Sequence, residues 1–150
     1  MNAKYNRVNS EVNMLLHSGF TDRQLYILSC EFLERVISHQ DDGCLKNVIA
    51  ARRAWLRGEI SDEEMAETWA VNWATAMVGD GDDVDWDDAK GGAVAAAWQA
   101  CYCAAHYATR GIVGLIPQDV WECGWIAECE WQITRMLREK NKDDPTQSPN

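Results

Sequence analysis

The 19-residue run from Gly91 to Thr109 limits the possible folds of this chain more than any other segment, because it contains no Asp, Glu, Lys or Arg. It is long enough to raise the question of a membrane span, but alanine and glycine dominate it, and it is interrupted by Gln99, Tyr102, His106 and Tyr107. Small side chains lie on nearly every side of a helix with this sequence, so neighbouring helices can approach it closely. The run therefore predicts a buried helix at the centre of a helical bundle.

The rest of the chain is also predicted to be helical. Apolar residues recur at helical spacing almost everywhere, and no segment shows a convincing two-residue alternation. The chain has 150 residues, enough for one domain with its own core. The sequence thus predicts an all-α fold, a single-domain bundle of about six helices over residues 1–140, with a disordered polar tail over residues 141–150. The expected helices begin near Ser10, Thr21, Cys44, Ser61, Trp86 and Pro117 and end near Ser18, Asp41, Arg57, Met77, Thr109 and Lys140.

Two capping boxes and one glycine mark individual helix ends. Thr21 is followed three residues later by Gln24, and Ser61 is followed in the same way by Glu64. In each pair the first side chain can cap a helix, and the second can return a hydrogen bond to the backbone of the first. Gly58 suits the left-handed position that follows the last turn of a helix.

The acidity of the chain is concentrated in one segment. The formal net charge is −10, yet residues 59–88 hold eleven acids and no Lys or Arg, while the other residues hold thirteen acids and fourteen bases. A chain with this balance is not expected to bind nucleic acid or an anionic membrane directly. It is suited to a protein with a basic surface, such as the nucleic-acid groove of another protein.

The six cysteines are expected to be buried, reduced thiols. Four of them lie in apolar helical stretches, and a chain of this length can fold without disulfides. The first ten residues, MNAKYNRVNS, lack the apolar core of a secretion signal. Both features predict a cytoplasmic location.

The densest group of acids is the stretch GDGDDVDWDDAKGG, residues 79–92, which holds six aspartates within nine residues. An EF-hand requires acidic or amide residues at loop positions 1, 3 and 5, glycine at 6 and glutamate at 12. An EF-hand loop that starts at Asp80 or at Asp83 does not match this pattern. A Ca²⁺ or Mg²⁺ site of another kind remains the alternative. Helix capping accounts for one or two of these aspartates, so the remaining carboxylates around Trp86 predict an acidic surface that binds a partner.

Two other groups of residues could carry chemistry, but each has a simpler structural explanation. Cys103 and His106 lie three residues apart and could bind zinc together with Cys101, Cys123 or Cys129. No C-x-x-C pair is present, however, so core thiols and a hydrogen-bonded histidine are expected instead. Acid–base catalysis would need a buried carboxylate, and the candidates are Glu128 and Glu130, which lie among tryptophans.

Eight tryptophans are many for the core of one small domain, and tryptophan is enriched in binding hot spots. Trp69 and Trp73 are four residues apart, as are Trp121 and Trp125, so each pair shares a helix face and is expected to belong to the core. Trp86 lies among aspartates, and it is the tryptophan expected to be exposed as an anchor for a basic groove.

The phrase AARRAWLRGEISDEEM, residues 50–65, is followed by helices rich in alanine and tryptophan, and it resembles Imm5-like immunity proteins and small helical phage proteins of that composition. The likeness covers residues 50–110, under half of the chain. The cysteine-rich and tryptophan-rich helices of the C-terminal half depart from it. The resemblance implies a protein that binds and neutralises another protein, and it assigns no functional residue.

We therefore expect a non-enzymatic acidic protein that binds and inhibits a partner, of the phage or bacterial conflict-system type, in the cytoplasm of a bacterial host cell. The partner is either a defence nuclease or CRISPR complex, blocked at its basic surface as by an anti-CRISPR, or a cognate toxin. No cofactor or metal is expected, and a homodimer is compatible with the sequence. The alternatives are a metal-dependent or thiol enzyme and a module that self-associates through its tryptophans. The residues expected to contact the partner are Glu63, Glu67, Asp80, Asp82, Asp83, Asp85, Trp86, Asp87 and Asp88.

Overall fold

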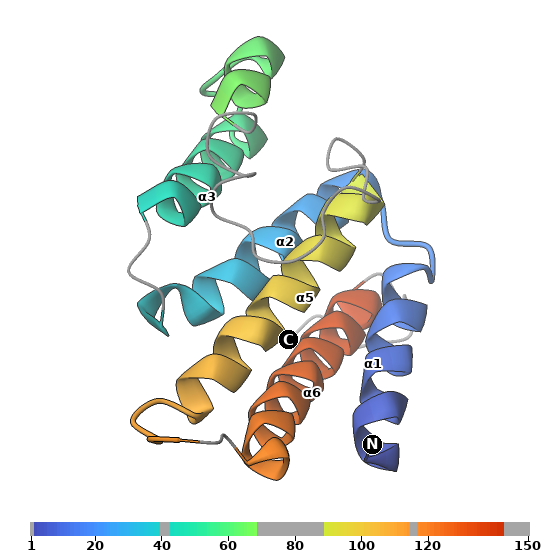
Figure 1. Cartoon of the computed structure of the whole chain (residues 1–150). Helices are drawn as coiled ribbons and strands as arrows, with labels where there is room; N and C mark the ends of the chain where they lie inside the picture. The colour runs from blue at the N-terminus through green and yellow to red at the C-terminus, as the bar shows by residue number, and fades with distance from the viewer. Residues whose placement is uncertain (1, 40–42, 69–88, 115–116, 143–150) are drawn as a thin grey trace.

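Helices form all the regular structure in the part of the chain that the computed structural model describes, residues 2–39, 43–68, 89–114 and 117–142 (Figure 1). The elements are α1 (Ala3–Leu16), α2 (Asp22–Val36), the short 3₁₀ helix η1 (Ile37–His39), α3 (Gly43–Leu56), α5 (Ala89–Ala108) and α6 (Gln118–Lys142). Residues 62–68 form a further helical stretch. The predicted all-α class is therefore confirmed.

Helix α5 lies at the centre of the bundle, as its small side chains predict (Figure 1). Its most extensive packing is with α2 and α6, and α1 contacts both α6 and α5. The side chains of Ala93 and Ala100 are fully buried, so their helix comes close to its neighbours. Larger side chains from the surrounding helices, among them Phe32 of α2 and Met136 of α6, complete the same core.

A second, smaller group of buried side chains joins α3 to the bundle. It consists of Leu45, Val48 and Ile49 of α3, Leu33 of α2, and Ala95 and Ala96 of α5. The main contacts of α3 are with α2. Helix α3 and residues 62–68 lie at one end of the molecule, away from α1 (Figure 1).

The predicted start of the second helix is confirmed in detail. Thr21 Oγ1 accepts a hydrogen bond from the backbone N–H of Gln24 at 3.1 Å, and Gln24 Oε1 accepts one from the backbone N–H of Thr21 at 2.9 Å. This capping box satisfies two backbone donors that the helix itself leaves free. It also sets the helix register that buries Leu25, Leu28 and Phe32.

The predicted start of the first helix is wrong. Helix α1 begins at Ala3 and not at Ser10. The Asn2 side chain caps it by accepting a hydrogen bond from the backbone N–H of Lys4 at 2.8 Å. Val8 is buried in this early part of the helix, but a few apolar residues among polar ones give only a weak periodic signal.

The last helix also extends beyond its predicted end. Helix α6 continues to Lys142 and not only to Lys140. Lys142 Nζ lies 3.2 Å from Glu139 Oε2, and a cation in the last turn suits the negative end of the helix dipole. The rest of the predicted tail, residues 143–150, lies outside the described residues, as do residues 86–88 at the predicted start of the fifth helix.

The charge-free helix is accommodated inside the protein. None of the helices in the described ranges combines the length and the apolar character that a bilayer crossing requires. Helix α5 instead buries its alanine-rich surface against α2 and α6.

Candidate functional site

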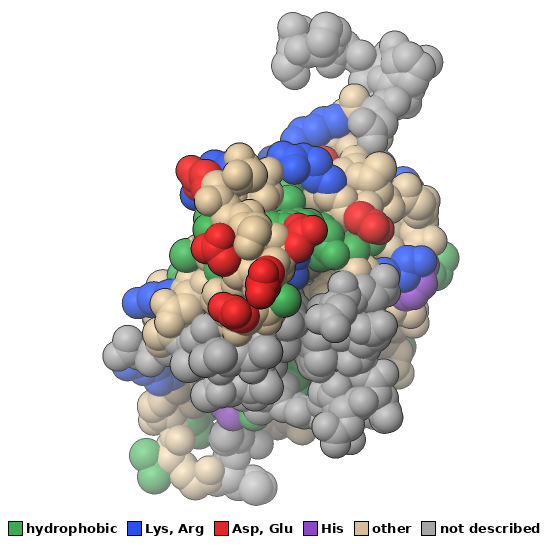
Figure 2. All heavy atoms as spheres, turned by 90° about the horizontal axis from the view of Figure 1, so that it is seen from above, with side chains coloured by type: hydrophobic (Ala, Val, Ile, Leu, Met, Phe, Trp, Pro, Cys, Tyr) green, Lys and Arg blue, Asp and Glu red, His purple; other side chains and the backbone are tan. Residues whose placement is uncertain are grey.

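The described part of the predicted acidic surface lies on residues 59–68, at one end of the molecule. Glu63 and Glu67 are in this part, and both side chains are exposed. They are four residues apart in a helical stretch, so they share one face. Figure 2 views the molecule from this end and shows acidic side chains gathered there. The other residues predicted to contact a partner, Asp80, Asp82, Asp83, Asp85, Trp86, Asp87 and Asp88, lie outside the described residues.

A tight turn at Gly58 leads from α3 towards the helical stretch of residues 62–68, here called the acidic helix. The φ angle of Gly58 is +75°, a conformation that side chains with a Cβ rarely adopt. Its backbone N–H donates to the Trp55 carbonyl at 3.0 Å, and the N–H of Glu59 donates to the Ala54 carbonyl at 2.9 Å. These two bonds form a Schellman motif, so Gly58 has the role predicted from the sequence.

Ser61 fixes the start of the acidic helix. Its Oγ accepts a hydrogen bond from the backbone N–H of Glu64 at 3.1 Å, and Glu64 Oε1 lies 3.4 Å from the backbone nitrogen of Ser61. The second predicted capping box is thus confirmed. Since the cap defines where the helix begins, it also defines the face on which Glu63 and Glu67 lie.

An open groove of about 720 Å³ lies beside the start of the acidic helix. Trp55 of α3 packs edge-on against Tyr26 of α2, with ring centroids 5.1 Å apart. Trp55 Nε1 donates to Asp62 Oδ1 at 2.7 Å, and the Arg52 guanidinium lies 4.2 Å from the centroid of the Tyr26 ring. These contacts tie the acidic helix to the bundle. The groove is further lined by Asp22, Arg23, Leu56 and Ile60.

Ion pairs neutralise many of the acids elsewhere in the described structure. The glutamates paired with Lys or Arg outside the acidic segment are Glu31, Glu34, Glu128, Glu130 and Glu139. Within the segment, Glu59 pairs with Arg57 at 2.8 Å. Among the described residues, no cation pairs with Glu63 or Glu67. These two like charges one helical turn apart repel each other, and a cationic partner would relieve the repulsion.

Buried thiols account for four of the cysteines. Cys30, Cys101, Cys103 and Cys129 are buried and reduced, and Cys123 is exposed. Burial raises the pKa of Cys30 to about 12 and also raises the pKa of Cys101 well above its ordinary value. These two thiols are therefore protonated at neutral pH and poor nucleophiles.

The residues of the predicted zinc alternative have other contacts. Cys103 Sγ lies 3.5 Å from Gln99 Nε2, and the exposed His106 ring packs on Tyr102 with centroids 4.3 Å apart. Cys101 and Cys129 are brought together, with 3.4 Å between their sulfur atoms. Among the described residues, no group of three or more His, Cys, Asp or Glu side chains is arranged to hold a metal ion.

Of the two glutamates considered for a buried carboxylate, Glu128 is buried and Glu130 is exposed. Arg35 Nε lies 3.3 Å from Glu128 Oε1, an ion pair without hydrogen-bond geometry. Burial raises the pKa of Glu128, and the charge of Arg35 offsets only part of that effect. Glu130 pairs with Lys4 at 3.6 Å. The two carboxylates thus have different partners and do not form a catalytic pair.

Glu128→Gln is expected to stabilise the protein at pH 7 and raise its unfolding temperature by a few degrees. The folded-state pKa of Glu128 is raised, so the protonated carboxyl favours the folded state. This contribution to stability is fully present below the ordinary pKa of 4.5, and it is lost as the pH rises through the folded-state pKa. Thermal unfolding of both proteins between pH 3 and pH 8 measures the effect. The variant's advantage should disappear at low pH, and an advantage independent of pH would contradict the explanation. Glu130→Gln is the exposed control.

Sequence reasoning missed the groove and the contacts that form it. Trp55 stands at an apolar helical position, and nothing in its spacing indicates a bond to Asp62. The turn at Gly58, which both residues flank, was the available signal, since a chain reversal there brings the end of one helix near the start of the next. The contribution of Tyr26 comes from packing between α2 and α3 and has no local signal.

Comparisons with protein-family models, with curated proteins and with solved structures found no match for this chain.

Proposed function

We propose that this chain is a non-enzymatic binding protein that inhibits a partner protein by covering a basic surface on it. The partner is a nucleic-acid-binding defence protein of a bacterium, such as a nuclease or CRISPR complex, or a cognate toxin. The chain would act in the cytoplasm of the bacterial host cell and would present the segment 59–88 to its partner.

The observation that supports this function most strongly is the uneven charge. Eleven acids and no bases lie in residues 59–88, while the other residues are nearly neutral. A field of one sign attracts a surface of the opposite sign and speeds association. Ion pairs within the bundle, such as Arg53 with Glu34, lower the net field elsewhere. Glu63 and Glu67 are exposed and pair with no cation of the described residues, which fits the same function.

The groove beside the acidic helix suits a long basic side chain of a partner. Its aromatic wall at Tyr26 and Trp55 can pack against the aliphatic stem of such a side chain, beside the chain's own Arg52, whose guanidinium lies 4.2 Å and 5.0 Å from the centroids of the two rings. Two acids, Asp22 and Asp62, and one cation, Arg23, are among its lining residues, so its lining carries a net negative charge. Tryptophan and tyrosine at such a position are typical of binding hot spots.

Changing Asp82, Asp83, Asp85 and Asp87 together to asparagine should weaken partner binding by about 100-fold or more and leave the bundle folded, because several charge pairs are lost at once. The partner is first captured from a bacterial lysate with the tagged chain and identified by mass spectrometry. Its affinity for the wild-type and variant chains is then measured at two salt concentrations, since screening should reduce the difference.

Two further variants make this test specific to the acidic segment. Glu63→Gln with Glu67→Gln should weaken binding by about 3- to 30-fold, while the matched control, Glu11→Gln with Glu130→Gln, removes the same charge from exposed positions elsewhere and should have little effect. If the partner is a nuclease, its nucleic acid should displace the chain. Unchanged affinity after the four-aspartate substitution would contradict the proposed function.

A further inference from the structure

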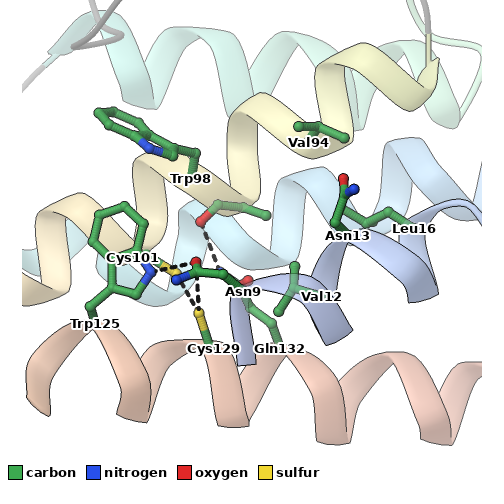
Figure 3. A pocket seen from close by; sticks show the side chains of 11 residues that line it. Asn9, Val12, Asn13, Leu16, Val94, Trp98, Cys101, Trp125, Cys129 and Gln132 are labelled. Atoms are coloured by element: carbon green, nitrogen blue, oxygen red, sulfur yellow. Dashed lines mark hydrogen bonds between the residues drawn. The ribbon is translucent and has the colours of Figure 1, made fainter. Parts of the chain in front are cut away.

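A small pocket lies between α1, α5 and α6, on a different part of the molecule from the acidic helix (Figure 3). Its volume is about 140 Å³, and it is open to solvent at one side. Its apolar lining includes Val12 and Leu16 of α1, Val94 of α5 and the rings of Trp98 and Trp125. An enclosed apolar cavity of about 150 Å³ in another protein holds benzene. This pocket has a similar volume but is open, so it can cover part of one aromatic ring.

Gln132 supplies an unpaired hydrogen-bond acceptor at this pocket. Its side chain is fully buried, and its Nε2 donates to the Ala97 carbonyl at 3.0 Å. Its Oε1 accepts no hydrogen bond from the part of the chain that the structure describes. Buried amide oxygens are rarely left without a donor in a folded protein, so a ligand donor placed beside this oxygen would complete its hydrogen bonding.

Asn9, a half-buried amide at the pocket, already has hydrogen-bond partners. Asn9 Oδ1 accepts a hydrogen bond from Trp125 Nε1 at 2.8 Å, and Asn9 Nδ2 donates to the Tyr5 carbonyl at 2.8 Å. These bonds hold Asn9 and the Trp125 ring in place (Figure 3). Asn9 is therefore less available to a ligand donor than Gln132, and the third amide that lines the pocket, Asn13, is exposed to water.

The aromatic wall favours a flat ligand. The rings of Trp98 and Trp125 meet edge to face, with centroids 5.8 Å apart and an interplanar angle of 77°. Trp98 is 40% exposed at the rim, so it is accessible from solvent. A third ring can pack against such a corner with offset or edge-to-face geometry. None of the described residues that line the pocket is charged, which disfavours an ionic ligand.

We propose that this pocket binds a small, neutral aromatic compound that carries one O–H or N–H donor, with the ring against Trp98 and Trp125 and the donor on Gln132 Oε1. Phenol has the size, the neutrality and the single donor that this description requires. Toluene has the same shape without the donor, and benzoate adds a charge. The proposal does not depend on the acidic segment, so it can fail or succeed independently of the inhibitory function.

The test is calorimetric titration of the full chain with phenol, toluene and benzoate. Phenol should bind saturably at one site with a dissociation constant of about 0.1–1 mM, and benzoate should not bind. Gln132→Leu should lower the ratio of phenol affinity to toluene affinity by about 3- to 10-fold, because only phenol loses a hydrogen bond. The ratio is compared between the wild type and Gln132→Leu, so that the difference in hydrophobicity between phenol and toluene cancels.

Val94→Trp fills the pocket and should abolish the binding of both neutral probes. The matched control is Met14→Trp, which adds the same side chain on α1 at a residue that is 70% exposed and does not line the pocket. Circular dichroism establishes whether each variant is folded. If Val94→Trp does not fold, the affinity ratio measured with Gln132→Leu decides the outcome. Phenol that fails to saturate, an affinity ratio unchanged in Gln132→Leu, or undiminished binding to folded Val94→Trp would each overturn the proposal.

Discussion

Replacing Gly124 with alanine is expected to destabilise the protein by about 1–3 kcal/mol, although alanine is the better helix former by about 1 kcal/mol. Gly124 lies in α6 where this helix crosses α5. A Cβ atom at this position would lie 2.8 Å from the Cβ of Ala108, 3.0 Å from the carbonyl oxygen of Ala104 and 3.0 Å from the Cα of Ala105. Two of these three atoms belong to the backbone of α5, so the helices would have to move apart.

Urea unfolding followed by circular dichroism measures this effect. Gly124→Val should be more damaging still, because a branched side chain enlarges the same overlap. The matched control is Gly43→Ala in α3, where an added Cβ meets no atom within 4 Å and the expected change is small or stabilising. A Gly124→Ala protein as stable as the wild type would show that the two helices can separate without loss.

A double substitution separates the side-chain contact from the backbone contacts. Ala108→Gly removes the nearest atom that the new Cβ would meet. Combined with Gly124→Ala, it should recover part of the lost stability but not all of it, since the carbonyl of Ala104 remains in place. The interaction energy from the double-mutant cycle gives the side-chain share directly.

The central position of α5 was predictable, but the close contact at Gly124 was not. Alanines recur through α5 at every helical offset, and that pattern alone indicates burial on all sides. Gly124 stands between Cys123 and Trp125, with no other small residue near it except Ala127. Which face of α6 meets α5 depends on packing across the whole bundle, and one glycine among large residues carries no such information.

The candidate site shows the same division between local and non-local information. The cap at Ser61 and the turn at Gly58 follow from neighbouring residues and were predicted correctly. The groove requires Tyr26 of α2 to meet Trp55 of α3, residues that are far apart in the sequence, and no local rule predicts their contact. The pocket beneath Trp98 depends equally on contacts between distant helices, such as the bond from Trp125 to Asn9.

Replacing Arg135 with alanine is expected to cost about 2–4 kcal/mol, the other large effect in this protein. Arg135 of α6 is only 10% exposed in its side chain and binds the carboxylate of Glu31 on α2 through both Nε and Nη2, the latter at 2.9 Å. Its Nη1 donates to Glu139 Oε2 at 3.0 Å. Removing the cation leaves the partly buried carboxylate of Glu31 unpaired and leaves Glu139 with the exposed Lys142 alone. An unpaired buried charge costs more than the pair contributed.

The low-pH behaviour of the wild type should reflect this network. Burial raises the pKa of Glu139, but the hydrogen bonds from Arg135 and Lys142 outweigh it, so the pKa lies below its ordinary value of 4.5. A lowered folded-state pKa means that Glu139 contributes stability above 4.5, which is lost as the pH falls through the folded-state pKa. Between pH 7 and pH 3 the wild type should therefore lose more stability than Glu139→Gln.

Replacing the whole network distinguishes the cost of an unpaired charge from a loss of packing. Arg135→Met with Glu31→Leu and Glu139→Leu removes all three charges together and should lie within about 1 kcal/mol of the wild type, because no carboxylate is left without a partner. Arg57→Ala breaks an exposed ion pair and should change the stability by no more than about 0.5 kcal/mol. If the triple variant were as unstable as Arg135→Ala, the loss would come from the packing of the arginine stem between α2 and α6, and the network would hold these helices by shape more than by charge.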